Sequence, residues 1–463
     1  MNTLPRRSAW PCLLLLCIAV SSACAQRQAS TIASALTEIL KKNAVPGMGV
    51  SIQVLDLRTG DVLFSEAAQE LRRPASTQKI LTAAAYLRTG APVAPTTELL
   101  KLSDGSLVLR GSGDALFSQE DLETLLSQAQ DRLGGKIPSV LVDSSRFEPP
   151  HFGKGWMWDD EPFAFMPYIS ALTIERGTVQ VRVSLSTGQV KVETTPDSAF
   201  FSVQTLPSAT SGRFSVTRGL GALGRTILVG GSTGSTSARI SVPDPDLFVG
   251  MVLARGLKQR LALPEEPPVK RADGPVVGTV LASLTRPLQS LLEAVLADSD
   301  NLAAECLLRL GTSTTGTITA EMGLARVARH LESLSIPKAA TNSVDGSGVS
   351  HYNLLTAATL VTVLKDLHLA DAATRKLFLD GLAVAGQRGT LARRMLKTAA
   401  DGRIYAKTGT INSVSNLAGY VMKDGEPVFA FAILCQSFTG PSSPARALQD
   451  ALCTALVKAA DQR

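Results

Sequence analysis

Histidine is scarce in this chain, and the few that occur do not form a metal-binding pattern. The 463 residues include four histidines, and no two stand at a helical ligand spacing such as His-Glu-x-x-His. A Gly-Lys-Ser/Thr sequence, which would mark a phosphate loop, is also missing. The sequence therefore predicts neither a metal nor another cofactor. His351 closely follows the turn Asp345-Gly346-Ser347-Gly348 and could approach a functional site, but we interpret this segment as a turn between two elements.

The chain also lacks blocks of basic residues. Its 46 Lys and Arg and 40 Asp and Glu residues give a formal net charge of +6, and the cations are dispersed. Nucleic-acid binding usually requires a clustered basic patch, so nucleic acid is excluded as the expected partner. A mild positive charge remains compatible with an anionic cell-wall surface.

Long apolar runs are absent, apart from one near the start of the chain. Arg6 and Arg7 precede the run from Leu13 to Val20, and Ala23-Cys24-Ala25 follows it. This order predicts a signal peptide over residues 1–25 that is removed before Gln26. The run is shorter than the ~20 apolar residues of a membrane helix, so we expect no transmembrane segment in the mature chain. We expect an exported, periplasmic protein, either free or loosely associated with the membrane, whose formal charge falls to +4 on cleavage.

Cysteine is equally sparse in the mature chain. Three of the six cysteines lie in residues 1–25, which leaves Cys306, Cys435 and Cys453. An odd number of cysteines in an exported protein argues against a disulfide framework. Because all three stand in apolar runs, we expect buried free thiols.

Three short polar motifs, by contrast, are present in a fixed order. They are Ser76-Thr77-Gln78-Lys79, Ser299-Asp300-Asn301 and Lys407-Thr408-Gly409-Thr410. A serine is a weak nucleophile near neutral pH and needs a base, a proton relay and donors for the oxyanion. The three motifs contain all of these parts, so together they predict an acylating serine site.

Each motif alone is weak, and the chain offers a decoy. Ser335-Ile336-Pro337-Lys338 also has the Ser-x-x-Lys spacing, but Pro337 argues against the helical turn that would bring hydroxyl and amine together. Singly, Ser76 reads as a helix cap, Lys79 as a surface lysine, Asn301 as a cap and Gly409 as a turn. The ordered set is what favours catalysis.

Periodicity predicts an α+β catalytic domain split by an insertion. Helical patterns at Ser30–Asn43 and after Pro74 enclose a hairpin, and helices return from Pro287 to about Leu310. A second hairpin crosses Asp424-Gly425 and a helix over Ala445–Ala459 follows. We therefore assign residues 26–95 and 278–463 to the catalytic domain. Residues 96–277 show short strands and a single helical run, Gln119–Leu133, and are predicted to form one or two inserted β-rich domains.

The inserted segment contains a concentration of aromatic residues. Seven of the chain's 22 aromatic residues lie between Phe147 and Tyr168. These side chains either wall a substrate groove or form the core of the inserted domain. We favour the core, because buried aromatic side chains dominate core packing.

The motifs and their spacing resemble the penicillin-binding protein 4-like family of low-molecular-mass penicillin-binding proteins, which are D-alanyl-D-alanine carboxypeptidases/endopeptidases. The separation of 223 positions between Ser76 and Ser299 matches that family's large insertion. Further similar segments are Gly111-Ser112-Gly113-Asp114, Asp345-Gly346-Ser347-Gly348, Ala385-Gly386-Gln387-Arg388-Gly389-Thr390-Leu391 and Leu417-Ala418-Gly419-Tyr420. The resemblance implies a serine penicillin-recognising fold, β-lactamase-like and transpeptidase-like.

The same resemblance implies a role for each motif residue. Ser76 is the nucleophile that attacks between two D-alanines of a peptidoglycan stem peptide, Lys79 the general base and Ser299 the proton relay. For Lys79 we expect burial and the nearby Lys407 to favour the neutral amine. Substrate binding falls to a set that holds the substrate amide and the terminal carboxylate: Asn301, Lys407, Thr408, Gly409 and Thr410. Cleavage of cross-links and covalent inhibition by β-lactams would use the same acylation step.

Three alternatives remain open. A serine β-lactamase shares these motifs but needs fast deacylation, and the Glu-x-x-x-Asn segment that activates water is missing: Asn342 and Asn353 follow Lys338 and Val349 by four residues. An esterase or amidase on the same scaffold is the second alternative. The third is a cell-wall-binding protein without catalysis, which the intact motifs disfavour.

Overall fold

Strands from both ends of the chain form one antiparallel sheet. The computed structural model describes residues 30–462 except 44, 91, 187–188 and 207–211, so the expected signal peptide lies outside the described residues. The sheet has the order β16-β17-β18-β19-β1-β2. Its strands are β1 (Gly49–Asp56), β2 (Val62–Glu66), β16 (Ala383–Val384), β17 (Ile404–Ile411), β18 (Val414–Lys423) and β19 (Glu426–Gln436).

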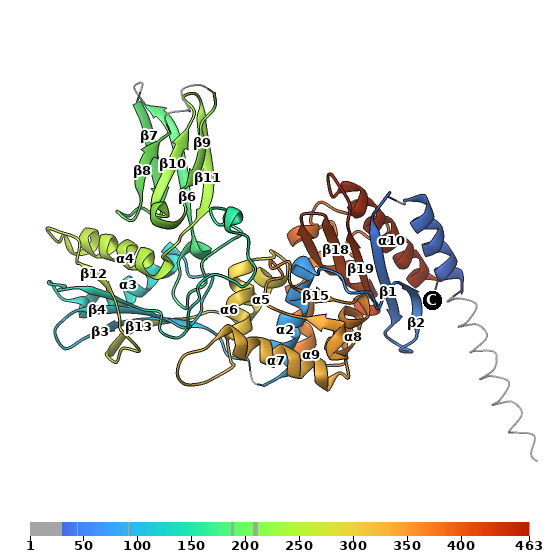
Figure 1. Ribbon diagram of the computed structural model, residues 1–463. Coiled ribbons are helices and arrows are strands. Elements are labelled where there is room, and N and C mark those ends of the chain that lie inside the picture. The colour runs from blue at the N-terminus through green and yellow to red at the C-terminus, as the bar shows by residue number, and fades with distance from the viewer. Residues whose placement is uncertain (1–29, 44, 91, 187–188, 207–211, 463) are drawn as a thin grey trace, which may run out of the picture.

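Helices cover both faces of this sheet (Figure 1). The helix over residues 30–42 and α10 (Ser443–Asp461) pack on one face. The other face is covered by a helical group that includes α2 (Gln78–Arg88), α5 (Leu288–Leu296), α6 (Asn301–Arg309), α7 (Ala320–Ser333), α8 (Ala357–His368) and α9 (Ala372–Gly381). Alternate residues of β19 enter the two cores, as the two-residue period of a strand requires: Phe429, Phe431 and Ile433 on one side, Ala430, Ala432 and Leu434 on the other.

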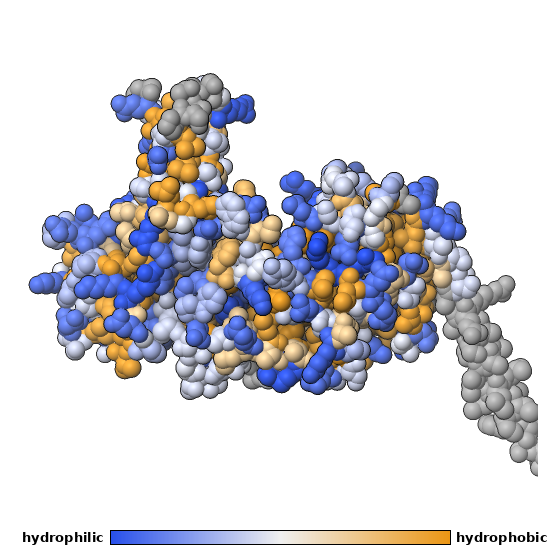
Figure 2. Space-filling model, viewed as in Figure 1, coloured by the Kyte–Doolittle hydropathy of each residue, from blue (hydrophilic) through white to orange (hydrophobic). Residues whose placement is uncertain are grey.

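The segment between the first two motifs forms a separate body with its own core (Figure 1). A five-stranded sheet has the order β12-β5-β4-β3-β13, with strands β3 (Thr96–Lys101), β4 (Leu107–Gly111), β5 (Val140–Asp143), β12 (Val269–Arg271) and β13 (Thr279–Thr285). Two three-stranded sheets project from it, built from β6 (Thr178–Ser186), β7 (Gln189–Thr195), β8 (Ser202–Thr205), β9 (Ser215–Arg218), β10 (Thr226–Gly230) and β11 (Ser235–Ser241). In the space-filling view these sheets and the catalytic region stand on either side of an open notch (Figure 2).

The described residues of the inserted segment form two α-helices where one was predicted. Helix α3 (Gln119–Leu133) has the predicted bounds and begins with a capping box between Ser118 and Asp121. Helix α4 (Pro245–Leu261) was missed, because its apolar run around Phe248 suits a buried strand as well as a helix. Gly250 lies where α4 meets the sheet, and a Cβ there would stand 2.6 Å from Val142.

The sheet of the inserted segment extends past residue 277. Strand β13 pairs with β3 in antiparallel register from Thr279 opposite Lys101 to Thr285 opposite Thr96. We therefore propose to end the insertion at 285, immediately before the helices of the catalytic domain. The α+β class itself is confirmed, and the described part of the chain has no helix of the length and apolarity needed to cross a membrane.

Candidate active site

Ser76 and Lys79 lie on one side of the first turn of a helix, as their spacing predicts. Ser76 is in a short 3-10 turn, Ala75–Thr77, that leads directly into α2. The Thr77 hydroxyl donates to the carbonyl of Pro74 at 2.7 Å and so anchors this turn. Lys79 Nζ is then 2.9 Å from Ser76 Oγ. The two groups are in direct hydrogen-bond contact, which is the geometry of a nucleophile and its base.

The amine of Lys79 is fully buried and has two further partners. Nζ lies 2.7 Å from Asn301 Oδ1 and 2.7 Å from the backbone carbonyl oxygen of Ser347. Burial lowers the pKa of Lys79 to about 8, against the opposing attraction of Asp345, Asp300 and Glu305. Roughly a tenth of the amine is therefore neutral at pH 7, far more than for an ordinary lysine.

The role expected for Lys407 in tuning Lys79 needs a correction. The charges that act on Lys79 are carboxylates, which raise its pKa, so burial accounts for the lowering. The repulsion between the two lysines acts instead on Lys407, whose pKa burial and Lys79 together hold well below the ordinary value. Both amines are thus driven toward the neutral form.

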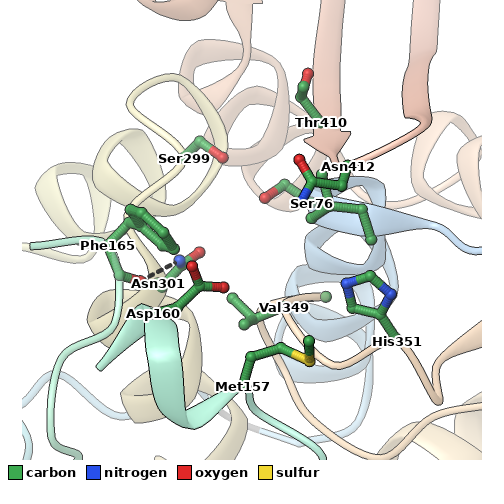
Figure 3. Close-up of a pocket in the computed structure, with 12 residues that line it drawn as sticks. Ser76, Met157, Asp160, Phe165, Ser299, Asn301, Val349, His351, Thr410 and Asn412 are labelled. Atoms are coloured by element: carbon green, nitrogen blue, oxygen red, sulfur yellow. Dashed lines mark hydrogen bonds between the residues drawn. The ribbon is translucent and has the colours of Figure 1, made fainter. Parts of the chain in front are cut away.

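The second motif meets the first through Asn301 and the third through Ser299. Asn301 is the first residue of α6, and the preceding Asp300 caps that helix by accepting from Ala303 N–H at 2.7 Å. The Nδ2 group of Asn301 donates to the carbonyl oxygen of Phe165 at 2.6 Å (Figure 3). This contact identifies the nitrogen end of the amide, so the oxygen end faces Lys79. Ser299 has a left-handed backbone with φ of 66°.

The third motif lies on β17 and reaches Ser299 through its lysine. Lys407 Nζ donates to Ser299 Oγ at 2.8 Å and to the carbonyl of Thr408 at 2.8 Å. Thr408 turns its hydroxyl to Thr390 Oγ1 at 2.9 Å, whereas Thr410 is exposed and faces the pocket. The three motifs therefore form one connected polar network.

Gly409 has a steric reason to be glycine. A Cβ at this position would lie 2.6 Å from the carbonyl oxygen of Pro74 and 3.1 Å from the backbone nitrogen of Ser76. Strand β17 approaches the turn that carries Ser76 too closely for any side chain at position 409. The expected binding role of Gly409 is thus accompanied by a packing role.

An open pocket of about 330 Å³ lies over these groups (Figure 3). Four of the eight predicted site residues line it: Ser76, Ser299, Asn301 and Thr410. Lys79 and Lys407 are buried beneath its floor, and Thr408 and Gly409 are not part of the wall. The wall is completed by residues that sequence reasoning missed, among them Met157, Asp160, Phe165, Val349, His351 and Asn412.

One preference drawn from the sequence is incomplete and another is wrong. His351 lies in a turn, as we interpreted its segment, and it also lines the pocket opposite Asp160. The aromatic residues do not form the core of the inserted domain: Phe165 is exposed at the pocket, and Trp156 packs in the catalytic helical core. The Trp156 indole donates to Asp345 at 3.0 Å. Asp160 and His351 are far apart in the chain, so no local pattern signals their meeting.

The structure also shows where the cysteines and the second Ser-x-x-Lys sequence lie. Cys306, Cys435 and Cys453 are free and buried, as predicted. The decoy Ser335 is in a left-handed turn with φ of 57° and starts no helix. Within the described ranges, no group of three or more His, Cys, Asp or Glu side chains is arranged to hold a metal ion.

Comparison with known proteins identifies the family. A model of the D-Ala-D-Ala carboxypeptidase 3 (S13) family matches residues 32–456. The chain belongs to this family. The S13 member is 30% identical to the D-alanyl-D-alanine carboxypeptidase of Actinomadura sp. strain R39, over 91% of this chain and 83% of that protein. It is 25% identical to D-alanyl-D-alanine carboxypeptidase DacB of Haemophilus influenzae, over 81% and 82% of the two chains.

A solved structure supports the fold of this S13 peptidase. The crystal structure of penicillin binding protein 4 from Haemophilus influenzae superposes with a TM-score of 0.77 at 21% identity, over 91% of this chain and 99% of that one. The match includes the inserted segment as well as the catalytic sheet, because it spans nearly the whole length. The chain is a serine-type D-Ala-D-Ala carboxypeptidase with the penicillin-recognising fold.

Proposed function

We propose that this carboxypeptidase acts through an acyl-enzyme on Ser76, with Lys79 as the general base. The observation that carries the proposal is the contact of 2.9 Å between Ser76 Oγ and the buried Lys79 Nζ. A neutral amine at this distance takes the hydroxyl proton as Oγ attacks the carbonyl carbon between two D-alanines. The backbone N–H groups of Ser76 and Thr410 are the proposed donors to the oxyanion.

Ser299 is the proposed path for the proton to the leaving amine. Its hydroxyl accepts from Lys407 Nζ at 2.8 Å, and a substrate carboxylate bound nearby would favour protonated Lys407, which can replace the proton that Ser299 gives up. The C–N bond then breaks, the terminal D-alanine departs as a neutral amine, and water later hydrolyses the ester on Ser76. Lys79 keeps the proton taken from Ser76 while Lys407 loses one, so protons and electrons balance without any cofactor.

The proposed carboxylate subsite is at the exposed end of β17. Lys407 is buried beneath the pocket, where a bound substrate carboxylate would favour its protonated form, and Thr410 presents a hydroxyl to the pocket. The Thr408 hydroxyl is hydrogen-bonded to Thr390. For Thr408 to bind the substrate carboxylate, this pair must rearrange or Thr390 must bind the carboxylate as well. Asn301 would donate its second Nδ2 proton to the substrate amide.

The proposed substrates are peptidoglycan stem peptides and D-alanyl cross-links in the periplasm. The predicted signal peptide supports export, and the acylation step is the same whether the leaving amine belongs to free D-alanine or to a second stem. β-Lactams are proposed as covalent inhibitors. A β-lactam complex of the Haemophilus influenzae penicillin binding protein 4 supports this proposal.

Labelling with a fluorescent penicillin tests the proposal. The mature chain should give a persistent adduct on the peptide that contains Ser76, and release D-alanine from a stem pentapeptide. Ser76→Ala should lose the adduct. Ser335→Ala, which alters the decoy Ser-x-x-Lys sequence, is the matched control and should label normally.

The alternatives give different results in the same experiment. Rapid turnover of nitrocefin without a lasting adduct would favour the β-lactamase. Cleavage of short esters without activity on D-Ala-D-Ala peptides would favour the esterase. Peptidoglycan binding that survives Ser76→Ala, in a chain that never labels, would favour a binding protein.

A further inference from the structure

Arg176 of the inserted segment forms ion pairs on both sides of Ser299. Its Nη2 lies 3.2 Å from Asp298 Oδ2 and its Nη1 lies 3.1 Å from Asp300 Oδ2. Asp298 and Asp300 are the immediate neighbours of Ser299 in the chain. One guanidinium therefore spans the residue that is proposed to relay the proton, and it does so from a different body of the molecule.

The conformation of Ser299 requires such support. Its φ of 66° is in the left-handed region, which serine rarely adopts. Without a partner, the carboxylates of Asp298 and Asp300 would also repel each other across it. Arg176 counters both the unfavourable backbone conformation and the repulsion, because pairing with the two carboxylates keeps them on one side of the turn.

Asp300 transmits this support to the rest of the second motif. One carboxylate oxygen caps α6 at Ala303 N–H, and the other pairs with Arg176. The cap sets where α6 begins, and Asn301 is its first residue. The orientation of Asn301 toward Lys79 therefore depends on an aspartate that Arg176 holds.

The segment that carries Arg176 is itself shaped for the contact. Glu175 and Arg176 both have left-handed backbones, with φ of 52° and 60°. Two such residues in succession persist only where the surrounding contacts enforce them. Here the Glu175 carboxylate accepts from Gln119 N–H at 3.1 Å, and its carbonyl accepts from the Thr178 hydroxyl at 2.6 Å.

A second contact from the inserted segment acts on the same motif. The carbonyl of Phe165 accepts from Asn301 Nδ2 at 2.6 Å, which fixes the amide with its oxygen toward Lys79 (Figure 3). The inserted segment thus contacts the second motif at two places, through Arg176 at the two neighbours of Ser299 and through Phe165 at Asn301.

We propose that Arg176 is a positioning residue for acylation, which holds Ser299 and Asn301 in their working geometry from the inserted segment. The proposal rests on the proposed function, since it assigns Arg176 to the proton relay of that same site. The insertion is then required to assemble the catalytic centre, in addition to any part it plays in substrate choice.

Arg176→Ala should slow the acylation step more than it weakens penicillin binding. A displacement of about 1 Å in a reacting group costs up to ~100-fold in rate, so we expect the rate constant for acylation to fall ~10- to 100-fold with a nearly unchanged dissociation constant. Arg176→Lys keeps a cation and should recover part of the rate. Stopped-flow measurement with a fluorescent penicillin separates the two constants.

The pH profile supplies a readout that a purely structural role would not change. Lys79 is surrounded by Asp300, Asp345, Glu305 and Lys407. Loss of the Arg176 cation leaves the negative charge of Asp300 uncompensated, and this charge favours protonated Lys79. The ascending limb of the acylation profile, which follows deprotonation of Lys79, should therefore move to higher pH in Arg176→Ala, and return toward the wild-type position in Arg176→Lys.

The chain contains a matched control for the loss of an arginine bridge. Arg271 also pairs with two aspartates two residues apart at the start of a helix, Asp244 and Asp246, and it lies in the five-stranded sheet away from the pocket. Arg271→Ala should therefore keep the wild-type acylation rate and pH profile. Thermal unfolding of each variant shows whether the fold survives.

Several outcomes would overturn the proposal. The first is a wild-type acylation rate and pH profile in folded Arg176→Ala. The second is a change in the dissociation constant alone, which would make Arg176 a substrate-binding group. The third is an equal fall in the acylation rate in Arg271→Ala. If Arg176→Ala does not fold, a wild-type rate constant and pH profile in Asp298→Asn, which removes one of the two pairs, would overturn it. If the unmodified chain forms no Ser76 adduct, the proposed function itself fails.

Discussion

The backbone carbonyl of Ser347 lies 2.7 Å from Lys79 Nζ, and this contact determines which way the amine can face. A neutral lysine has two N–H donors and one lone pair. The Ser347 carbonyl and Asn301 Oδ1 can only accept, so they take both donors. A protonated Lys79 donates its third N–H to Ser76 Oγ, whereas in the neutral amine the lone pair is left for the Ser76 hydroxyl. The network thus orients the neutral amine for general-base catalysis.

Lys79→Ala should slow acylation by penicillin by ~100- to 10,000-fold, the range that general bases contribute. Lys79→Arg should be no better, because a guanidinium stays protonated and has no lone pair for the Ser76 proton. Time courses of fluorescent-penicillin labelling measure both variants. Wild-type kinetics in Lys79→Ala would remove this residue from the role of base.

The acylation rate should rise with pH. Since the pKa of Lys79 is about 8, most of the amine is protonated at pH 6 and most is neutral at pH 9. Only the neutral form accepts the Ser76 proton, so the second-order rate constant should increase ~10-fold per pH unit well below 8 and level off above it. A flat profile between pH 6 and 9 would contradict this assignment.

Gly409→Ala should impair acylation although it removes no polar group. The new methyl group would lie 2.6 Å from the Pro74 carbonyl oxygen and 3.1 Å from Ser76 N, so β17 and the nucleophile must move apart. We expect labelling to slow ~10- to 100-fold. Gly135→Ala is the control, because a Cβ there would meet nothing within 4 Å. Equal labelling rates in the two variants would contradict the packing role.

Asp345→Asn should destabilise the fold. The buried carboxylate accepts from four donors: Gly348 N–H at 2.7 Å, Ser350 N–H at 2.8 Å, Asn353 Nδ2 at 2.8 Å and Trp156 Nε1 at 3.0 Å. An amide keeps one accepting oxygen and turns an NH₂ group toward the remaining donors. We expect a loss of about 3 kcal/mol in the free energy of unfolding, measured by urea denaturation.

A surface aspartate provides the comparison for that change. Asp371 caps α9 by accepting from Thr374 N–H at 3.0 Å, and asparagine caps helices equally well. Asp371→Asn should therefore leave the urea midpoint nearly unchanged. If Asp345→Asn unfolds at the same midpoint as Asp371→Asn, the buried carboxylate is not needed to hold its loop.

The local sequence pattern was enough to predict an element wherever the residues within or next to that element determine its structure. The helix over Gln119–Leu133 was predicted with the observed bounds, because its cap Ser118 and its apolar periodicity are local to that part of the chain. The order of the three motifs likewise indicated a serine site, and Ser76 and Lys79 meet because one helical turn joins them. By contrast, α4 and the pairing of β13 with β3 depend on neighbours that are distant in the chain.

The amino-acid sequence by itself determined the class of this enzyme: the three ordered motifs, the split α+β catalytic domain and the carboxypeptidase family. Only the tertiary structure decided the supporting contacts, namely the carbonyls of Ser347 and Phe165, the ion pairs of Arg176, and His351 in the pocket wall. The physical reason is that every residue carries a carbonyl and many surfaces carry arginine, so such groups leave no local signal. Folding alone selects which of them reach the nucleophile.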